Sequence, residues 1–324
     1  MKLLYVVHRY APFPGGSEIY VQNIAEESRR RGHTVAVLAG EHQGDYNGVR
    51  VSNDGNILLE PWDLIVIHGG DVHVQNFVLT NAARIPNPIL YMLVLPSSSN
   101  ACLQGLRDCA YIGCSTTQDW EHCKKYGVEN KAVRIRHGIN LNQSLGTTGF
   151  KKKYNIRGTM FLSCGGYWPN KAMIELADVF KKINTKDATL VTTGYDNRMN
   201  LMPSDSDKVR NFILDDRADV LSAIKDADCL VMHSYQEGFG LVLLEAMVNK
   251  TPWIARQIAG AKLMKDYGHT YTDDTQLVHE LLSFNRENFN IEQAYDYAMS
   301  NHLIQHTVDD IELVIKLLPN PSNF

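Results

Sequence analysis

The sequence predicts an α/β protein with two domains, in each of which short apolar strands alternate with helices. Apolar runs such as Leu3–Val7 and Cys229–Met232 recur along the chain, and each is followed by a glycine-containing loop and a helical pattern. The chain has 324 residues, 44% of them hydrophobic, which exceeds one typical core and suffices to fill two. The polar segment Asn140–Lys153, with two glycines and three lysines, has the composition of a linker.

The first domain opens with a strand, a loop and a helix. Leu3–Val7 is the strand, the Pro- and Gly-rich segment Tyr10–Gly16 is the loop, and Ser17 is expected to cap the helix. Gly32 ends that helix and His33–Leu38 supplies the next strand, which completes a β-α-β unit. Further strands are expected at Leu64–Ile67, Ile89–Leu95, Tyr111–Cys114 and Ala132–Arg136, with helices near Val72–Ala83 and Thr117–Tyr126.

The second domain repeats this alternation after the linker. The expected strands and helices are Met160–Cys164, Lys171–Ile183, Ala188–Thr193, Val209–Leu214, Arg217–Lys225, Asp228–His233, Leu241–Val248 and Trp253–Ala255. We place the domains at 1–145 and 146–324, and expect the last helix, at about 302–317, to lean back on the first domain. Because ligands bind at the carboxyl ends of strands in parallel sheets, the loops that follow the strands are the candidate sites.

Charge and composition exclude several classes of function. A net charge of −4 and an isoelectric point near 6.3 argue against general nucleic-acid binding, which needs a basic surface. The six cysteines form no C-x-x-C pair, so reduced thiols are expected rather than disulfides or a zinc site. No run reaches about 18 apolar residues, the length of a membrane span, and no signal peptide is visible. A cytoplasmic protein is expected, with a peripheral membrane contact left open.

The segment Glu237–Leu241 and the helix after it form the most specific candidate site. A buried strand ends near His233, and Gly238 and Gly240 on either side of Phe239 let the backbone approach a ligand closely. The first amides of the following helix have no intrahelical acceptor and attract phosphate. Glu245 lies within an apolar helix, where a carboxylate usually serves a ligand. The alternative is that Glu237 caps the helix and Glu245 lies on its solvated face.

Two further glycine loops carry candidates of the same kind. Gly15 and Gly16 offer a surface without side chains at a helix start, although a simple tight turn is the alternative. In the second domain, Gly165 and Gly166 follow a strand, and Lys171 is expected in the first turn of the next helix. A lysine opposes the helix dipole there, so a diphosphate would stabilise it; a solvated lysine is the alternative.

These residues together resemble the family-four glycosyltransferases. The matching segments, in order, are Pro14–Glu18 with Arg31–Val35, Cys114–Ser115 with Tyr126–Val128, His137–Asn140, Gly165–Lys171 and Glu237–Glu245. The last is similar to the family's E-x7-E signature and keeps both glutamates. The resemblance implies a GT-B fold, in which two Rossmann-like parallel-sheet domains face one another across a cleft that holds the active site.

The resemblance also implies an activity: retaining, metal-independent transfer of a hexosyl group from a UDP- or GDP-sugar to a hydroxyl-bearing acceptor, with no cofactor. The acceptor is a glycan, a lipid-linked molecule or a small molecule. Lys171 and Glu237 would be catalytic, holding the diphosphate and the sugar. The implied donor-binding residues are Gly15, Gly16, Gly166, Gly238, Phe239, Gly240, Leu241 and Glu245, with Glu245 at the ribose hydroxyls.

Three positions depart from the family pattern. Gly166 stands where an arginine is usual, so Lys171 would act alone or with a substitute such as Arg217 or Arg256. The acceptor-side histidine is missing from the stretch that contains Ser97, and its role could pass to a serine, to His68 or to no residue. His137 replaces an asparagine in the turn before the linker, which is expected to alter only the turn.

The sequence is also compatible with other functions. An epimerase acting on nucleotide sugars or a sugar phosphorylase would use the same fold, and His68 is as compatible with a structural role as with an acceptor site. A non-catalytic nucleotide-sugar binding protein is the alternative from a different class, because two family residues are missing.

Overall fold

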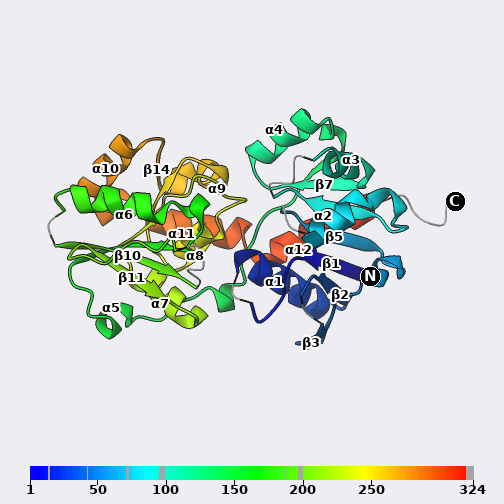
Figure 1. Cartoon of the computed structure of the whole chain (residues 1–324), viewed down its shortest axis with the longest axis horizontal. Helices are drawn as coiled ribbons and strands as arrows, with labels where there is room; N and C mark the ends of the chain where they lie inside the picture. The colour runs from blue at the N-terminus through cyan, green and yellow to red at the C-terminus, as the bar shows by residue number, and fades with distance from the viewer. Residues whose placement is uncertain are drawn as a thin grey trace. The chain divides into compact units, whose positions relative to one another are not determined.

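The computed structural model describes residues 1–13, 15–41, 43–70, 73–94, 99–185, 187–195 and 200–318. Within it the chain forms two compact units (Figure 1). Unit 1 comprises Met1–Gly138 and the segment from Leu303 onward, and unit 2 is Ile139–His302. Each unit contains one mainly parallel sheet with helices packed on it, so the predicted α/β class is confirmed. The domain limits 1–145 and 146–324 remain a prediction.

The sheet of unit 1 has the strand order β3-β4-β2-β1-β5-β6-β7-β8 in the described chain. Its strands are β1 (Lys2–Val7), β2 (Thr34–Ala39), β3 (Gly44–Tyr46), β4 (Val49–Ser52), β5 (Leu64–His68), β6 (Ile89–Met92), β7 (Tyr111–Cys114) and β8 (Ala132–Arg134). The pairs are parallel except β3 with β4. The central strands β1 and β5 are buried almost throughout, which is why their sequences are continuous apolar runs.

The α-helices of unit 1 are α1 (Gly16–Arg30), α2 (His73–Thr80), α3 (Asn100–Asp108), α4 (Thr117–Tyr126) and α12 (Ile304–Leu317), with short 3-10 turns η1 (Gly55–Leu59), η2 (Ala82–Arg84) and η3 (Glu129–Lys131). The predicted cap at Ser17 is wrong. Gly15 occupies the N-cap position in extended conformation, and its carbonyl oxygen accepts the amide of Ile19 at 2.9 Å. The first helical hydrogen bond therefore forms before Ser17 is reached, and Ser17 lies inside the helix.

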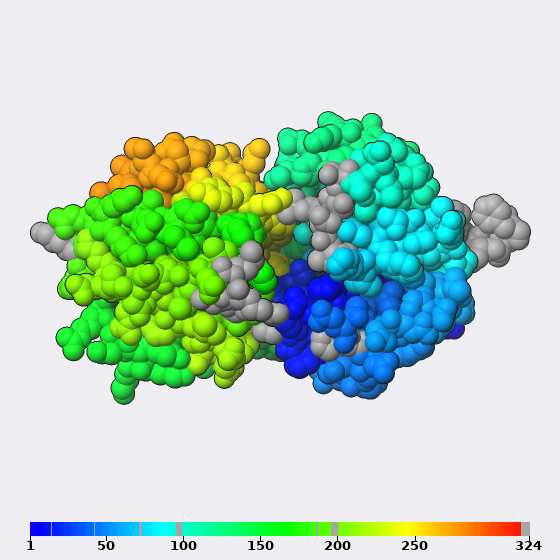
Figure 2. Space-filling view, viewed as in Figure 1, coloured from blue at the N-terminus to red at the C-terminus, as the bar shows by residue number. Residues whose placement is uncertain are grey.

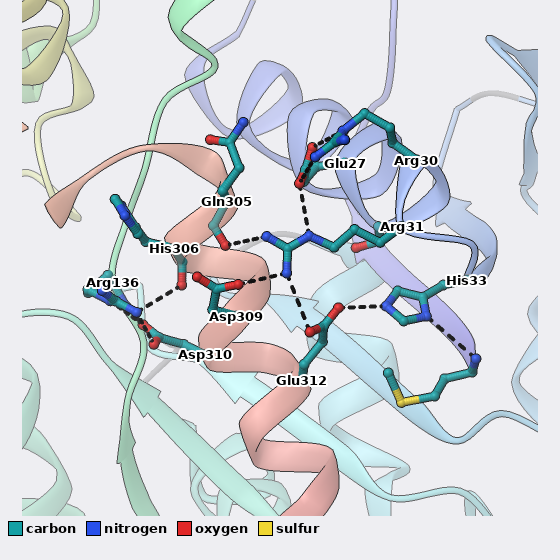
Figure 3. Close-up of polar contacts among 12 residues, drawn as sticks. Glu27, Arg30, Arg31, His33, Arg136, Gln305, His306, Asp309, Asp310 and Glu312 are labelled. Atoms are coloured by element: carbon teal, nitrogen blue, oxygen red, sulfur yellow. Dashed lines mark hydrogen bonds and ion pairs between the residues drawn. The ribbon is translucent and has the colours of Figure 1, made fainter. Parts of the chain in front are cut away.

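Helix α12 joins unit 1 through polar contacts that Figure 3 shows. Arg31, just after α1, pairs with Asp309 at 2.7 Å. His33 lies 2.8 Å from Glu312, and Arg136 donates to both carboxylate oxygens of Asp310, at 2.6 and 2.9 Å. Since Arg136 is fixed by two parallel bonds, its contact is the strong, charge-assisted kind. Helix α12 is thus held against the segments that follow α1 and β8.

The sheet of unit 2 has the order β11-β10-β9-β12-β13-β14, and all its recorded pairs are parallel. Its strands are β9 (Thr159–Cys164), β10 (Ala188–Gly194), β11 (Val209–Ile213), β12 (Cys229–Met232), β13 (Trp253–Arg256) and β14 (His269–Tyr271). Alternate residues of β9 enter different cores: Met160 and Leu162 one, Phe161 the other. The sheet is therefore covered on both faces, as parallel sheets require.

The α-helices of unit 2 are α5 (Phe150–Lys153), α6 (Met173–Lys182), α7 (Arg217–Asp226), α8 (Leu241–Val248), α9 (Ala259–Leu263), α10 (Asp274–Leu282) and α11 (Ile291–Asn301), with 3-10 turns η4 (Leu141–Gln143), η5 (Pro169–Lys171), η6 (Lys265–Tyr267) and η7 (Arg286–Asn288). Helices α6 and α10 share one core and adjoin at the surface of the unit (Figure 2). Helices α7, α8 and α11 contribute to the other core.

Candidate functional site

The candidate site of unit 2 lies in the loops that follow its central strands. The loop after β9 runs from Gly165 to η5, the loop after β12 from His233 to Gly240, and α9 begins just after β13. Because these strands are parallel, their carboxyl ends meet at one edge of the sheet, where α/β proteins bind ligands. Hydrogen bonds join the first two loops: the Tyr235 amide donates to the Asn170 carbonyl at 2.8 Å, and the Asn170 side chain to that of Gln236 at 3.0 Å.

Lys171 and Glu237 form an ion pair between these two loops. The Lys171 Nζ is 2.5 Å from Glu237 Oε1, and Ser234 Oγ donates to the same oxygen at 2.7 Å. The side chain of Lys171 is 23% exposed and that of Glu237 11%. Both charged groups are therefore largely shielded from water but still accessible from the solvent. Lys171 is thus not the fully solvated lysine of the alternative interpretation.

The predicted position of Lys171 in the first turn of a helix is wrong. Pro169 begins the separate 3-10 turn η5, and Lys171 is its last residue. Ala172, at φ 51°, is left-handed and separates this turn from α6, which starts at Met173. The argument from the helix dipole therefore does not apply, and the charge that faces Lys171 in this structure is Glu237.

Helix α8 begins after a glycine in the left-handed conformation. Gly240 is left-handed at φ 91°, and a Cβ there would lie 3.1 Å from the sulfur of Met232. Phe239 is buried in the core, and its carbonyl oxygen accepts the amide of Gly260 at 3.0 Å. The core thus fixes the turn Gly238–Gly240, and the amides at Leu241 start a helix whose first donors have no intrahelical acceptor.

Glu245 does not lie on a solvated face of α8, so that alternative is wrong. The residue is 9% exposed and forms an ion pair with Arg217, the first residue of α7. Burial disfavours the charge of Arg217, but the neighbouring Glu245 outweighs it and raises the pKa of the guanidinium. This ion pair joins the start of α7, which follows β11, to the middle of α8. The spacing of the two residues in the sequence does not indicate that they meet.

The position of the Trp168 ring explains why residue 166 is a glycine rather than an arginine. A Cβ there would lie 2.2 Å from the indole Nε1 of Trp168, which itself donates to the Tyr195 hydroxyl at 3.3 Å. The Trp168 ring therefore occupies the space that an arginine side chain at position 166 would need. Of the two suggested substitutes, Arg217 pairs with Glu245, and Arg256 belongs to a different cluster.

That cluster surrounds Arg256 at the ends of β12, β13 and β14, and sequence patterns did not single it out. The Arg256 guanidinium lies 4.8 Å from the ring centroid of Tyr235 and 5.5 Å from that of Tyr271. Its Nε donates to the carbonyl of His233 at 3.4 Å. His233 Nδ1 lies 2.6 Å from the Tyr271 hydroxyl, and burial, with Arg256 second, lowers the pKa of His233 to about 4. The imidazole is neutral at pH 7.

In unit 1, Gly15 and Gly16 begin α1 after the loop that follows β1. A Cβ at Gly16 would meet no atom within 4 Å, whereas one at Gly15 would lie 2.1 Å from a carboxylate oxygen of Glu18. Burial raises the pKa of Glu18, although Arg9 lies 3.7 Å away. The backbone at Gly16 is therefore open to a close approach, while that at Gly15 is covered by an acidic side chain.

The acceptor-side candidates have different outcomes. Ser97 lies outside the described residues. His68 ends β5 and is 6% exposed, with its ring 5.3 Å from that of Tyr20 and 6.4 Å from that of His137. His137 stacks on Tyr20 at 4.8 Å and hydrogen-bonds Ser115. His137 therefore belongs to a buried aromatic cluster. It does this in addition to its place in the turn before the linker, which the sequence predicted.

The buried His68 makes stability depend on pH. Burial lowers its pKa from 6.5 to about 4. The unfolded chain takes up this proton near pH 6.5 but the folded chain only near 4, so the free energy of unfolding should fall as the pH drops between these values, by at most about 1.4 kcal/mol per unit. Urea unfolding at pH 7, 6 and 5 measures the slope. His68→Gln should reduce the slope without abolishing it, because the pKa of His233 is lowered to about 4 as well, and equal slopes in the wild type and the variant would contradict the assignment.

Among the described residues, no group of three or more His, Cys, Asp or Glu side chains is arranged to hold a metal ion. No helix within them is long and apolar enough to cross a membrane.

Comparison with known proteins identifies the domain that carries the Lys171–Glu237 pair. Residues 158–283 match the family model described as "Glycosyl transferases group 1". No curated protein matches the chain. The matched segment contains every candidate residue of unit 2, so this part of the chain is similar to the domain of the group 1 glycosyl transferases.

Solved structures similar to the whole chain show its fold. Anabaena HepE in complex with UDP and glucose has a TM-score of 0.74 at 17% identity, with 98% of this chain and 100% of that one covered. Sucrose-phosphate synthase from Thermosynechococcus elongatus gives 0.76 at 15%, with 98% of each chain covered. A Rickettsia africae glycosyltransferase gives 0.74 at 16%, again with 98% of each. The predicted GT-B fold is confirmed.

Proposed function

We propose that this chain is a retaining glycosyltransferase that moves a hexosyl group from a nucleoside diphosphate sugar to a hydroxyl of an acceptor. The observation that carries the proposal is the Lys171–Glu237 pair, which lies between two loops at the carboxyl edge of the sheet, inside the matched domain. The binding of UDP and glucose by the similar HepE supports a nucleotide-sugar donor, and a UDP- or GDP-sugar is the donor class we propose.

Lys171 acts on the diphosphate in this proposal. The departing diphosphate gains negative charge as the bond to the sugar breaks, and an ammonium group held in place stabilises that charge without reorganisation. The amides at the start of α8, around Leu241, add partial positive charge from the helix dipole. Since Lys171 and these amides supply the electrostatic stabilisation, the proposed reaction does not need a metal ion.

Glu237 binds the sugar and Glu245 the ribose. A carboxylate accepts hydrogen bonds from hydroxyl groups, and Glu237 is fixed for this by Ser234 as well as by Lys171. When a diphosphate draws Lys171 toward it, Glu237 keeps the Ser234 bond and gains acceptor capacity for a sugar hydroxyl. Arg217 holds Glu245, which leaves its second oxygen for the ribose hydroxyls.

The glycines provide backbone surface for the donor. Gly166 lies in the loop after β9, before Lys171, and Gly238 and Gly240 lie in the loop after β12, beyond Glu237; Phe239 anchors this second loop in the core. In unit 1 we assign donor contact to Gly16 and Gly15, which is supported by the open backbone at Gly16. His68 and Ser97 remain the acceptor-side proposals, and the acceptor is a glycan, a lipid-linked molecule or a small molecule.

A panel of ligands in a thermal-shift experiment tests the donor. The panel contains UDP, GDP and ADP, UDP-glucose, UDP-N-acetylglucosamine, GDP-mannose and ADP-glucose, with inorganic phosphate and UMP as controls. One diphosphate and its sugar should raise the unfolding temperature, because a ligand at 100 times its dissociation constant stabilises by about 2.7 kcal/mol. A flat panel would contradict the proposal.

Product analysis then separates transfer from its alternatives. The donor selected by the panel is incubated with and without candidate acceptors, and the product is identified by NMR. A retaining transferase gives a glycoside with the anomeric configuration of the donor. An isomerised nucleotide sugar formed without acceptor indicates an epimerase, and a reaction that consumes inorganic phosphate indicates a phosphorylase.

A further inference from the structure

We propose that Tyr235 is a stacking platform for a pyranose ring beside the Lys171–Glu237 pair, an inference that rests on the proposed function. Tyr235 lies two residues before Glu237 in the loop after β12, and it is 54% exposed. Single exposed aromatic residues are common and need no explanation. Tyr235 differs from such residues in three ways: Arg256 packs against one face of its ring, it lies in the same loop as Glu237, and its open face can stack against a sugar.

The support comes from Arg256 under one face of the ring. The guanidinium carbon lies 4.8 Å from the ring centroid of Tyr235, so the exposed surface belongs to the opposite face and the edge. Arg256 is 15% exposed and is fixed by its bond to the His233 carbonyl and by Asp274 at 3.7 Å. The attraction between the cation and the aromatic face helps to hold the Tyr235 ring in this position.

A second layer holds Arg256 in turn. The ring of Tyr271, at the end of β14, lies 5.5 Å from the guanidinium carbon. His233 Nε2 is 3.3 Å from Arg256 Nη2, and a neutral His233 can accept there. The exposed ring is therefore backed by buried side chains from three strand ends, which reduces the entropy that it would lose on binding.

The place of the ring decides which ligand it fits. Its backbone amide is bonded to Asn170, one residue before Lys171, and its neighbour Ser234 is bonded to Glu237. The ring and the carboxylate that we assign to the sugar thus belong to one short loop, two residues apart, and the proposal is that a pyranose on the open face of Tyr235 reaches Glu237. A pyranose has one face of C–H groups and a rim of hydroxyls, so it can stack on the ring while its rim bonds to a carboxylate.

The stacked pyranose can come from two sources, the hexosyl group of the donor or a sugar unit of the acceptor. Both present the same chemistry to the ring. A nucleobase is also flat and is the competing occupant, but the bonds of this loop run to Glu237, whereas Glu245, which we assign to the ribose, pairs with Arg217 from α7. Loss of nucleoside diphosphate binding would therefore count against the platform.

Three variants test the platform. Tyr235→Leu removes the ring, Tyr235→Phe keeps it, and Tyr295→Leu is the matched control because it removes another ring of unit 2 that carries a cation, Lys250 at 5.0 Å. Calorimetry measures the dissociation constants of UDP and UDP-glucose, or of GDP and GDP-mannose if the panel selects guanine. Steady-state kinetics measures the acceptor KM.

We expect UDP binding to be unchanged in all three variants. In Tyr235→Leu either the dissociation constant of UDP-glucose or the acceptor KM should rise at least tenfold, and the affected quantity identifies the source of the pyranose. Tyr235→Phe and Tyr295→Leu should stay within twofold of the wild type. Unchanged values in Tyr235→Leu, or an equal loss of UDP and UDP-glucose binding, would overturn the proposal.

A second measurement does not depend on donor binding. Saturation-transfer NMR with maltose should show transfer from the protein to the C–H protons of one sugar face in the wild type and Tyr235→Phe, and a loss of that signal in Tyr235→Leu. If the panel of nucleotides is flat but this difference is seen, the proposed function fails while the platform stands. If maltose behaves alike in wild type and Tyr235→Leu and donor and acceptor are also unaffected, the platform is rejected.

Discussion

Replacing either Glu237 or Lys171 by alanine is expected to abolish sugar transfer while the fold stays intact. The two side chains meet at 2.5 Å between the short 3-10 turn η5 and the loop after β12, and neither belongs to the hydrophobic cores. Removing a positioned group that stabilises transition-state charge lowers kcat by about 10²- to 10³-fold. Transfer rates with the donor that the panel selects, together with circular dichroism and unfolding temperature, measure the two parts of this prediction.

A matched pair in the same unit serves as the control. Lys250 and Glu292 form an ion pair at 2.7 Å whose side chains are 44% and 71% exposed. Lys250→Ala removes a lysine of the same geometry from a solvated surface, where such pairs contribute about 0–1 kcal/mol, and should leave transfer unchanged. Full activity of Glu237→Ala and Lys171→Ala would refute the catalytic assignment.

Lys171→Arg separates charge from shape. Arginine keeps the positive charge, but its planar guanidinium is larger and presents its donors in a fixed fork, so it cannot replace a compact ammonium 2.5 Å from a carboxylate without movement. We expect partial activity, between those of the wild type and Lys171→Ala. Activity equal to that of Lys171→Ala would show that position, rather than charge alone, governs the step.

Replacing Arg217 by methionine should destabilise the protein by about 3 kcal/mol, because it leaves the carboxylate of Glu245 buried without its partner. Glu245 is 9% exposed and lies among the apolar residues of α8, so water can reach it poorly. Methionine fills much of the volume of the arginine stem, which limits the loss of packing. Urea unfolding at pH 7 measures the change, and it should be accompanied by weaker binding of the nucleoside diphosphate.

The double replacement Arg217→Met with Glu245→Gln isolates the pair. Removing both charges should recover at least half of the stability lost in the single variant, since the penalty arises from the unpaired carboxylate rather than from the missing contact. Nucleotide binding should stay weak in the double variant if Glu245 contacts the ribose. Additive losses of stability would mean that the two side chains do not interact.

The order of elements was predictable because the central strands of the two sheets, such as β1, β5, β9 and β12, are apolar runs followed by glycine-containing loops. Three strands were not foreseen: β3, β4 and β14 have only three or four residues each, and β3 and β14 lack a continuous buried pattern. Such short strands, at the edge of a sheet or next to it, are defined by their pairing with a neighbour, as β14 is by β13. Local sequence carries little signal for them, since the stabilising contact is made elsewhere in the chain.

The starts of α1 and α6 show a second limit. Ser17 and Lys171 both have residue types that fit the first turn of a helix, yet α1 begins earlier and α6 later. In each case a backbone conformation decides, extended at Gly15 and left-handed at Ala172. Neither conformation is encoded strongly by a single residue, because the packing of the neighbouring loop selects it.

By itself the sequence determined the alternation of strands and helices, the glycine loops at strand ends and the identity of the acids Glu237 and Glu245, because these depend on residues close together in the chain. Tertiary structure alone decided which charges meet: Lys171 with Glu237 across 66 positions and Arg217 with Glu245 across 28. It also placed Arg256 beneath Tyr235. The contacts of Lys171 and of Arg256 join segments at the carboxyl ends of different strands, and that of Arg217 joins the start of α7 to the middle of α8. Which of these elements adjoin is set by packing over the whole unit rather than by distance along the chain.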